Sequence, residues 1–177
     1  LRLLLTYQMT CPGKKLNFMG NEFAQAREWQ VNQQLDWNLL DYKLHRGVQL
    51  AIHDLNHLYL ETPALHQLDF EQEGFCWADC NDADQSVISY LRYAQDGSFS
   101  LIVLNFTPVP RENYRIGVPA RGIYHEVFNS DSTYYGGGNI GNPKQIFSAA
   151  EPWLEYQDSV IITLPPLAGI ILALTPT

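Results

Sequence analysis

From about residue 70 onward, short β-rich segments alternate with turn residues, and this spacing limits the possible folds more than any other feature of the chain. The sequence Asp96-Gly97 between two of these segments is a strong β-hairpin signal. Strands at such intervals predict an antiparallel sandwich. The seven expected strands comprise residues 75–79, 86–93, 99–106, 114–118, 124–129, 160–164 and 170–174.

The first third of the chain has a different pattern and predicts α/β structure. Residues 1–11 and 42–61 are expected helices, and in the second of them apolar side chains recur at three- and four-residue spacing. A short buried strand at 15–19 and a polar loop at 20–40 are expected between them. This order is typical of the last unit or two of a parallel α/β barrel, and we place the boundary with the sandwich near residues 66–72.

Composition and charge narrow the class of protein. Hydrophobic residues make up 46% of the 177 residues, which indicates a globular chain. The net charge of -8 argues against a nucleic-acid partner and is compatible with a neutral ligand such as a carbohydrate. Three cysteines, an odd and low number, favour reduced thiols in a cytoplasmic protein. The apolar stretch at 160–174 is too short and too interrupted to span a membrane.

The segment from Lys15 to Trp29 combines a carboxylate, an amide, a guanidinium and an indole. Sugar-binding sites use such a mixture, with polar groups for hydroxyls and an aromatic face for the ring. Glu22, Glu28 and Asp36 are the nearest carboxylates, and paired carboxylates perform acid/base chemistry on glycosides. None lies in an apolar run that would raise its pKa, so capping the loop or pairing with Arg27 is as well supported as substrate contact.

Other motifs have a structural and a functional interpretation. Gly136 to Gly141 matches the dinucleotide pattern G-x-G-x-x-G, but no helix is expected after it, so we interpret it as a loop. His53 and His57 share one helix face, and with no third ligand evident we interpret them as surface residues. Asn105 begins a glycosylation sequon, which we discount because it ends an apolar strand.

Aromatic residues of the β part give a further open alternative. A sugar-stacking platform and ordinary packing are both compatible with their number, and packing is the commoner role of aromatic residues in a sandwich. The candidates are Trp77, Tyr134, Tyr135 and Trp153.

The chain contains an ordered series of motifs that begins with Pro12–Gln25, Arg27–Trp29 and Leu35–Trp37. These three resemble the last barrel strand and its loop in the bacterial 1,4-α-glucan (glycogen) branching enzymes of the α-amylase superfamily. Gly47–Gln49 and Asp54–Asn56 resemble the final barrel helix. The motifs that resemble the β domain are Leu68–Phe70, Gly74–Phe75, Asn105–Pro110, Asn129–Ser132 and Leu164–Leu167.

The resemblance implies an α+β fragment with two parts. Residues 1–68 would be the last strand and helices of a (β/α)8 barrel, and residues 69–177 an all-β antiparallel sandwich domain. The family's three catalytic carboxylates precede the final barrel strand, so the resemblance implies no catalytic residue in this chain. His53-Asp54 is a His-Asp pair in letters only, because it falls in the final helix.

For function, the resemblance implies transfer of α-1,4-glucan segments to a 6-hydroxyl without a cofactor or a metal. It implies a cytoplasmic, monomeric parent protein that acts on glycogen, and an isolated fragment that is inactive. Apolar surface is expected on the first 65 residues, exposed or hidden by self-association. A carbohydrate-binding module and a related hydrolase or debranching enzyme are the alternatives. The candidates for substrate contact are Glu22, Gln25, Arg27, Glu28 and Trp29.

Overall fold

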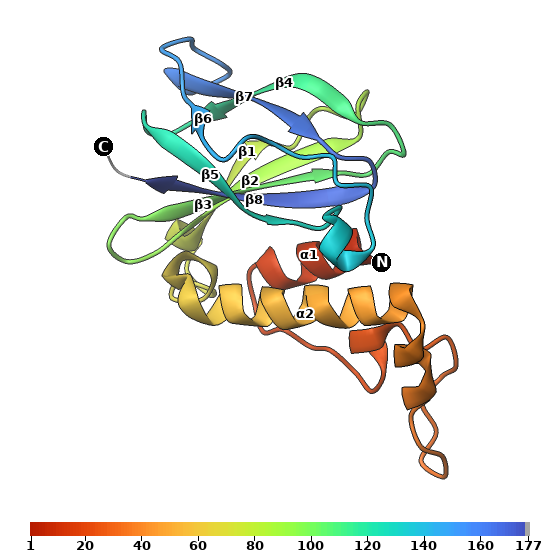
Figure 1. Ribbon diagram of the computed structural model, residues 1–177. Helices are drawn as coiled ribbons and strands as arrows, with labels where there is room; N and C mark the ends of the chain where they lie inside the picture. The colour runs from red at the N-terminus through yellow and green to blue at the C-terminus, as the bar shows by residue number, and fades with distance from the viewer. Residues whose placement is uncertain (176–177) are drawn as a thin grey trace.

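The structure, a computed structural model, describes residues 1–175. Two helices, α1 (Arg2–Thr10) and α2 (Lys43–Glu61), pack under a large β-sheet, and a small sheet lies on its other face (Figure 1). Both expected helices are therefore confirmed, with ends that differ by one residue. Short 3-10 turns connect these elements, and they are η1 (Asn21–Phe23), η2 (Trp37–Asp41), η3 (Pro63–Leu65), η4 (Gln72–Gly74) and η5 (Thr133–Tyr135).

All strand pairs are antiparallel, and they form a six-stranded sheet in the order β1-β2-β3-β8-β5-β6 and a two-stranded sheet, β4-β7. All seven expected strands are present, whereas the two-residue strand β6 was not expected. The hairpin at Asp96-Gly97 joins β2 to β3, and Gly97 adopts a φ of 82° in the turn. The strands are β1 (Phe75–Asp79), β2 (Val87–Tyr93), β3 (Phe99–Asn105), β4 (Arg111–Val118), β5 (Ile123–Asn129), β6 (Ile146–Phe147), β7 (Asp158–Leu164) and β8 (Ala168–Thr175).

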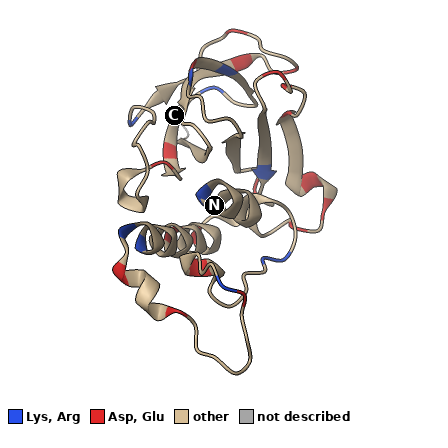
Figure 2. Cartoon of the chain, turned by 90° about the vertical axis from the view of Figure 1, so that its right-hand side faces the viewer, with Lys and Arg blue, Asp and Glu red and all other residues tan. Residues whose placement is uncertain are grey.

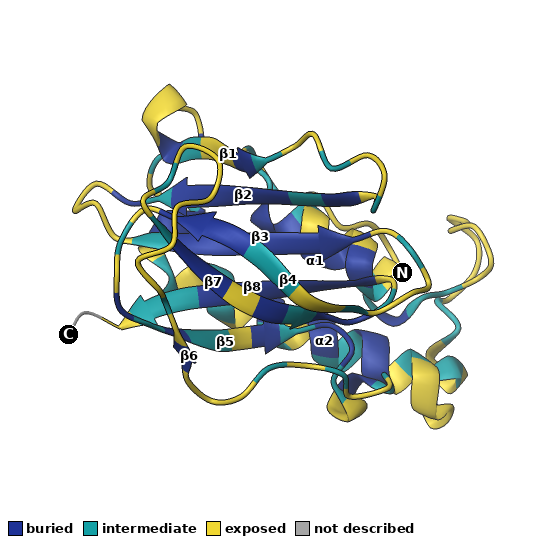
Figure 3. Ribbon diagram, turned by 90° about the horizontal axis from the view of Figure 1, so that it is seen from above, coloured by how far each residue is buried: buried dark blue, intermediate teal, exposed yellow. Residues whose placement is uncertain are grey.

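The large sheet is buried on both faces because two separate apolar cores cover it (Figure 3). Along β3, Ile102 and Leu104 belong to the core between the large sheet and the helices. Leu101 and Val103 belong to the core between the large and the small sheet. This alternation follows from the two-residue repeat of a strand. A strand with four successive apolar residues, 101–104, therefore lies in the middle one of three layers.

The helix α2 buries its apolar stripe on α1 and on η5. Val48, Ala51 and Leu55 are buried, whereas Leu44, which has the same spacing, is 63% exposed. Gly47 permits the contact with η5, since a Cβ atom at this position would lie 2.3 Å from the carbonyl oxygen of Tyr135. The stripe alone could not reveal this contact because its partner is about 90 residues away in the chain.

A buried cation joins the helical part to the large sheet. Arg92 on β2 is fully buried and donates hydrogen bonds to the carbonyl oxygens of Thr10, Leu65 and Gly74. Its Nη2 also donates to Oδ1 of Asp69 at 2.5 Å. The guanidinium therefore ties the end of α1, the segment before β1 and strand β2 at one point.

The expected strand at 15–19 is wrong for this structure. Residues 14–18 have no regular secondary structure and pair with no strand among the described residues, and Leu16, Phe18 and Met19 are exposed. A strand exists only where a neighbour satisfies its backbone N–H and C=O groups. The residues described thus do not show the barrel part that the resemblance implies. Exposed apolar surface on the first 65 residues is confirmed, and it also includes Leu1 and Leu4 of α1.

The described residues contain no helix that combines the length and the apolar character needed to cross a membrane. The three cysteines are free, with Cys76 and Cys80 exposed and Cys11 half-buried. Lys and Arg are scattered singly or in small groups over the fold and do not gather into one large surface (Figure 2).

Candidate functional site

The loop that carries the predicted site residues begins with a glycine turn. Gly20 has a φ of 91°, and its N–H donates to Oε2 of Glu22 at 2.9 Å. The N–H of Gln25 donates to the carbonyl oxygen of Gly20, also at 2.9 Å. A Cβ atom at position 20 would lie 2.8 Å from the Cβ of Gln25, so both the turn and its neighbour require glycine. The Glu22 carboxylate is thus engaged in shaping the turn.

Gln25 and Arg27 brace the loop across its width. The N–H of Asp36 donates to Oε1 of Gln25 at 2.7 Å, and the Gln25 amide donates to the carbonyl oxygen of Arg27 at 2.9 Å. Arg27 donates to Asp36 Oδ1 at 2.7 Å and to the carbonyl oxygen of Gln34 at 3.0 Å. Pairing of Asp36 with Arg27, one of the two interpretations of these charges, is confirmed. The pair is partly exposed, so it fixes geometry more than it adds stability.

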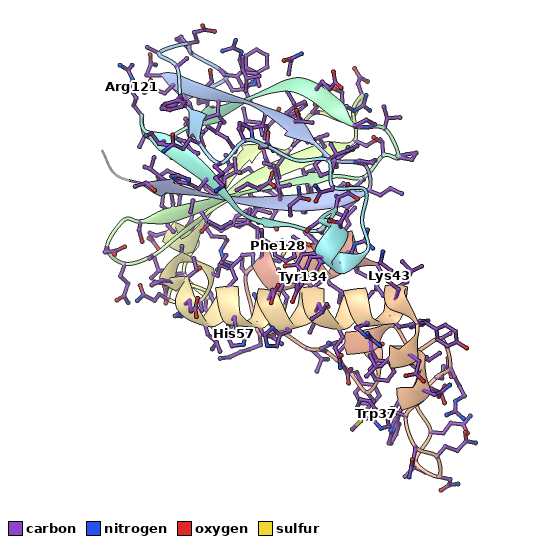
Figure 4. The ribbon with its side chains drawn as sticks, in the orientation of Figure 1. Trp37, Lys43, His57, Arg121, Phe128 and Tyr134 are labelled. Atoms are coloured by element: carbon purple, nitrogen blue, oxygen red, sulfur yellow. The ribbon has the colours of Figure 1, made fainter. Side chains whose placement is uncertain are left out.

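The loop is anchored to α2 through Phe23. Phe23 is fully buried and its ring lies 5.0 Å from that of Trp37, measured between centroids. The carbonyl oxygen of Phe23 is 2.8 Å from Nδ1 of His45, which lies in the first turn of α2. Trp37 itself lies on the side of the loop that is remote from the sheets (Figure 4).

Arg27, Glu28 and Trp29 are the exposed residues among the predicted site residues, and the Arg27 guanidinium is already bound to Asp36 and Gln34. An open hollow of about 390 Å³ lies beside them. Trp29 is 41% exposed, and its ring is packed edge-on against Phe18 at 5.6 Å between centroids. Glu22 does not line the hollow. The lining residues are Phe18, Met19, Asn21, Gln25, Ala26, Arg27, Glu28 and Trp29.

The chemical capacity of this hollow follows from its walls. A carboxylate and amide groups can bind hydroxyls, and a half-exposed indole offers an apolar face. Because the hollow is open on one side, it suits a ligand that also contacts other surfaces. Within residues 1–175, no group of three or more His, Cys, Asp and Glu side chains is arranged to hold a metal ion.

The aromatic platform considered for the β part is not one surface. Trp77 borders a hollow of about 450 Å³ with Tyr156, and Trp153 borders one of about 460 Å³. These two hollows share Asp79 and Asp82 and are therefore adjacent. The Trp77 ring packs on Phe75 and Tyr90 of the core that faces the helices, whereas the Trp153 ring lies beside Arg115 of the small sheet. Tyr134 and Tyr135 belong to η5, which contacts α2 and borders neither hollow.

The glycine-rich segment 136–141 is a loop, as expected. It closes around Asp131, whose carboxylate accepts hydrogen bonds from the N–H groups of Gly138 and Ile140. Asn105, the residue of the sequon, is 1% exposed and donates to the carbonyl oxygens of Val109 and Pro165. Both motifs therefore have structural roles. No pattern in the sequence predicts the contacts of the buried Arg92, since a single arginine in an apolar strand does not reveal its partners.

The β part of the chain matches a known protein family. The family described as "Alpha amylase, C-terminal all-beta domain" matches residues 77–175. The 1,4-alpha-glucan branching enzyme GlgB of Nitrosomonas eutropha is 69% identical over 172 residues, covering 97% of this chain and 24% of that protein. The protein of the same name from Cellvibrio japonicus is 56% identical over 98% of this chain and 24% of its own length. The chain spans about a quarter of these relatives.

Solved structures agree on the fold. An alpha-amylase from H. orenii superposes with a TM-score of 0.55 at 17% identity, over 98% of this chain and 35% of that chain. The pullulanase SAP of Group B Streptococcus superposes with a TM-score of 0.63 at 13% identity, over 98% of this chain and 28% of that one. At these identities the likeness concerns the fold alone.

Proposed function

The chain belongs to the family of the α-amylase C-terminal all-β domain, and from this premise we propose that the protein containing it is a 1,4-α-glucan branching enzyme of glycogen synthesis. The enzyme would cut an α-1,4-glucan, hold the released segment as a covalent glycosyl-enzyme and pass it to a 6-hydroxyl. Relatives with this name match almost the whole chain, which supports the proposal. The proposal includes a cytoplasmic, monomeric protein. Its substrate would be glycogen, and it would have no nucleic-acid or membrane partner.

Glucan contact is assigned to the loop that follows residue 20. The observation that carries this assignment is the hollow beside Glu28 and Trp29, next to a loop braced by Arg27 and Asp36. In this proposal the Trp29 indole packs on a sugar ring and the Glu28 carboxylate accepts hydrogen bonds from hydroxyls. Glu22, Gln25 and Arg27 hold the loop in position. No residue of this chain is assigned the nucleophile or acid/base role, and neither a metal nor a cofactor is required.

In the whole protein, residues 1–68 would form the end of a (β/α)8 barrel, and residues 69–177 the β domain. The exposed apolar side chains of Leu16, Phe18 and Met19 support this division. Segment 15–19 would then pair with neighbouring barrel strands. Slow amide exchange at 15–19 in the full-length protein, compared with fast exchange in the 177-residue chain, is the expected result. Equal exchange rates in the two proteins would contradict the division.

The branching assignment is tested with two proteins. The 177-residue chain, incubated with amylose, is expected to leave the absorbance of the iodine complex unchanged. The full-length protein is expected to shift it and to produce α-1,6 linkages detectable by proton NMR. Branching by the 177-residue chain would disprove the assignment of catalysis to other residues. Hydrolysis without new α-1,6 linkages by the full-length protein would favour a hydrolase or debranching enzyme.

The glucan contacts are tested by substitutions in the full-length protein. Trp29→Ala and Glu28→Gln are expected to raise KM for amylose by about fivefold, because each removes a contact made with the bound chain. Gln30→Ala is the matched control, since Gln30 is exposed in the same loop but does not line the hollow. An unchanged KM in both Glu28 and Trp29 variants would remove these residues from the glucan site.

A second candidate function is binding of carbohydrate by the β domain itself. The observation that favours it is the pair of adjacent hollows beside the exposed Trp77 and Trp153. Affinity electrophoresis of the 177-residue chain in glycogen gels is the test, with Trp77→Ala and Trp153→Ala as variants. Retardation that these variants abolish would support a binding module, and unretarded migration would leave the domain with a scaffolding role. Tyr134→Ala serves as the control, since Tyr134 is exposed but lines neither hollow.

Self-association of the isolated chain is a further part of the proposal. Leu1, Leu4 and Leu16 are each more than half exposed, and burial of such surface between copies would be favourable. Sedimentation velocity over a range of concentrations is the test. A monomer at all concentrations would show that the exposed surface does not drive association.

A further inference from the structure

Two histidines on α2 form a close pair in solvent. His53 and His57 are separated by one helical turn, and their ring centroids are 4.5 Å apart. Both rings are exposed, and His57 lies on the side of α2 that faces away from the sheets (Figure 4). Among the described residues, no group donates to or accepts from the His57 ring. The pair therefore places two exposed imidazole rings side by side, one helical turn apart.

The orientation of His53 is fixed by a chain of hydrogen bonds. Its Nδ1 lies 3.0 Å from Oδ1 of Asp54, and the Tyr135 hydroxyl donates to Oδ2 of the same carboxylate at 2.6 Å. The Asp54 carboxylate is ionised and can only accept hydrogen bonds, as it does from the Tyr135 hydroxyl. In its contact with His53 the donor is therefore Nδ1, which carries the proton of the neutral ring. The lone pair is then on Nε2, which Asp54 does not contact.

Such a carboxylate–histidine arrangement is the usual support of a metal-binding imidazole, since it selects the tautomer and increases the basicity of the free nitrogen. The Tyr135 contact adds rigidity because η5 and α2 pack closely at Gly47. Here the support is built from two distant parts of the chain.

We propose that His53 and His57 chelate a first-row divalent cation that prefers imidazole nitrogen, such as Cu²⁺ or Zn²⁺, with Asp54 and Tyr135 as positioning residues. Two protein ligands leave the remaining coordination positions to water, so the site is open and exchangeable. The affinity is expected to be higher for Cu²⁺ than for Zn²⁺, following the general order for nitrogen ligands. Bridging one turn of α2 also stabilises the folded chain by mass action.

The test uses the 177-residue chain with Cys76 and Cys80 replaced by serine, because exposed thiols compete for the same cations. Titration calorimetry with CuCl₂ and with ZnCl₂ at pH 7.5 gives the dissociation constants. His57→Gln is expected to raise the constant for Cu²⁺ by about tenfold or more, because the second ligand acts at high effective concentration. Asp54→Asn is expected to weaken binding by about tenfold through the orientation of His53.

Two controls separate chelation from the mere number of histidines. The double variant His57→Gln/Glu61→His keeps the number but places the rings two turns apart, and it is expected to bind as weakly as His57→Gln. His125→Gln removes a histidine whose Nδ1 is 2.7 Å from the carbonyl oxygen of Lys144, and it is expected to leave binding unchanged.

Equal affinity of the parent chain and His57→Gln would overturn the proposal. An electron paramagnetic resonance spectrum of the Cu²⁺ complex that shows fewer than two coupled imidazole nitrogens would also overturn it. This spectrum needs no variant at the site, so it decides the question even if a substitution unfolds the chain.

Discussion

Replacement of Arg92 by methionine tests how the helical part is held on the large sheet. The side chain is fully buried and makes four hydrogen bonds, three to backbone carbonyl oxygens and one to Asp69. Methionine fills similar space but leaves these acceptors unpaired. Removing one partner of a buried ion pair typically costs about 3–5 kcal/mol. Tyr59 and Lys15 still face the Asp69 carboxylate, at 3.1 and 3.9 Å, so we expect a loss near the lower end of this range.

The assay is urea unfolding followed by circular dichroism, with the free energy of unfolding extrapolated linearly to water. The double variant Arg92→Met/Asp69→Leu is expected to be more stable than Arg92→Met by about 1–2 kcal/mol, because it removes the uncompensated carboxylate. Arg121→Met is the control, since Arg121 is exposed and its pair with Asp158 at 2.8 Å is expected to contribute less than about 1 kcal/mol. A loss below about 1 kcal/mol for Arg92→Met, or additive losses in the double variant, would refute the reasoning.

Three further predictions concern the packing of η5 and its neighbours. Gly47→Ala is expected to destabilise the chain by about 1–3 kcal/mol in thermal unfolding, although alanine favours a helix, because its Cβ would meet the Tyr135 carbonyl oxygen at 2.3 Å; the exposed Asn56→Ala should not destabilise. Burial raises the pKa of Glu126 despite hydrogen bonds from Asn142 and Asn129. The folded state therefore binds the Glu126 proton more tightly than the unfolded state does. The free energy of unfolding of the parent chain, relative to that of Glu126→Gln, should fall as pH rises above about 4.5 and through the folded-state pKa. A difference that does not change with pH would contradict this. Asp131→Ala should speed amide exchange at Gly138 and Ile140, whose N–H groups it binds; unchanged exchange would show that the loop holds itself.

The strand pattern was predictable because it depends on local signals. Turn residues such as Asp96-Gly97 and alternating or continuous apolar runs identify strands in the sequence. How those strands are divided between sheets depends on contacts over long distances. The pairing of β8 with both β3 and β5, and of β4 with β7 alone, has no local signature. The strand β6, with two residues, is too short to produce a pattern.

The site was predicted as a set of residue types, and the structure divides this set by geometry. Gln25 and Arg27 were candidates for substrate contact on the same grounds as Trp29. Their polar atoms are hydrogen-bonded within the loop, whereas Glu28 and Trp29 are open. Residue type shows what a side chain can bind, but only coordinates show which of its atoms are already engaged.

By itself, the sequence determined the two helices, seven of the strands and the resemblance to branching enzymes, because these depend on periodicity, turn chemistry and ordered motifs. Tertiary structure alone decided that segment 15–19 is no strand here, since a strand requires a paired neighbour. It also decided that Arg92 and Asp69 meet inside the molecule, and that His53 receives its orientation from Asp54 and Tyr135. These contacts join residues that are far apart in the chain, and their energies depend on burial and geometry that no local pattern specifies.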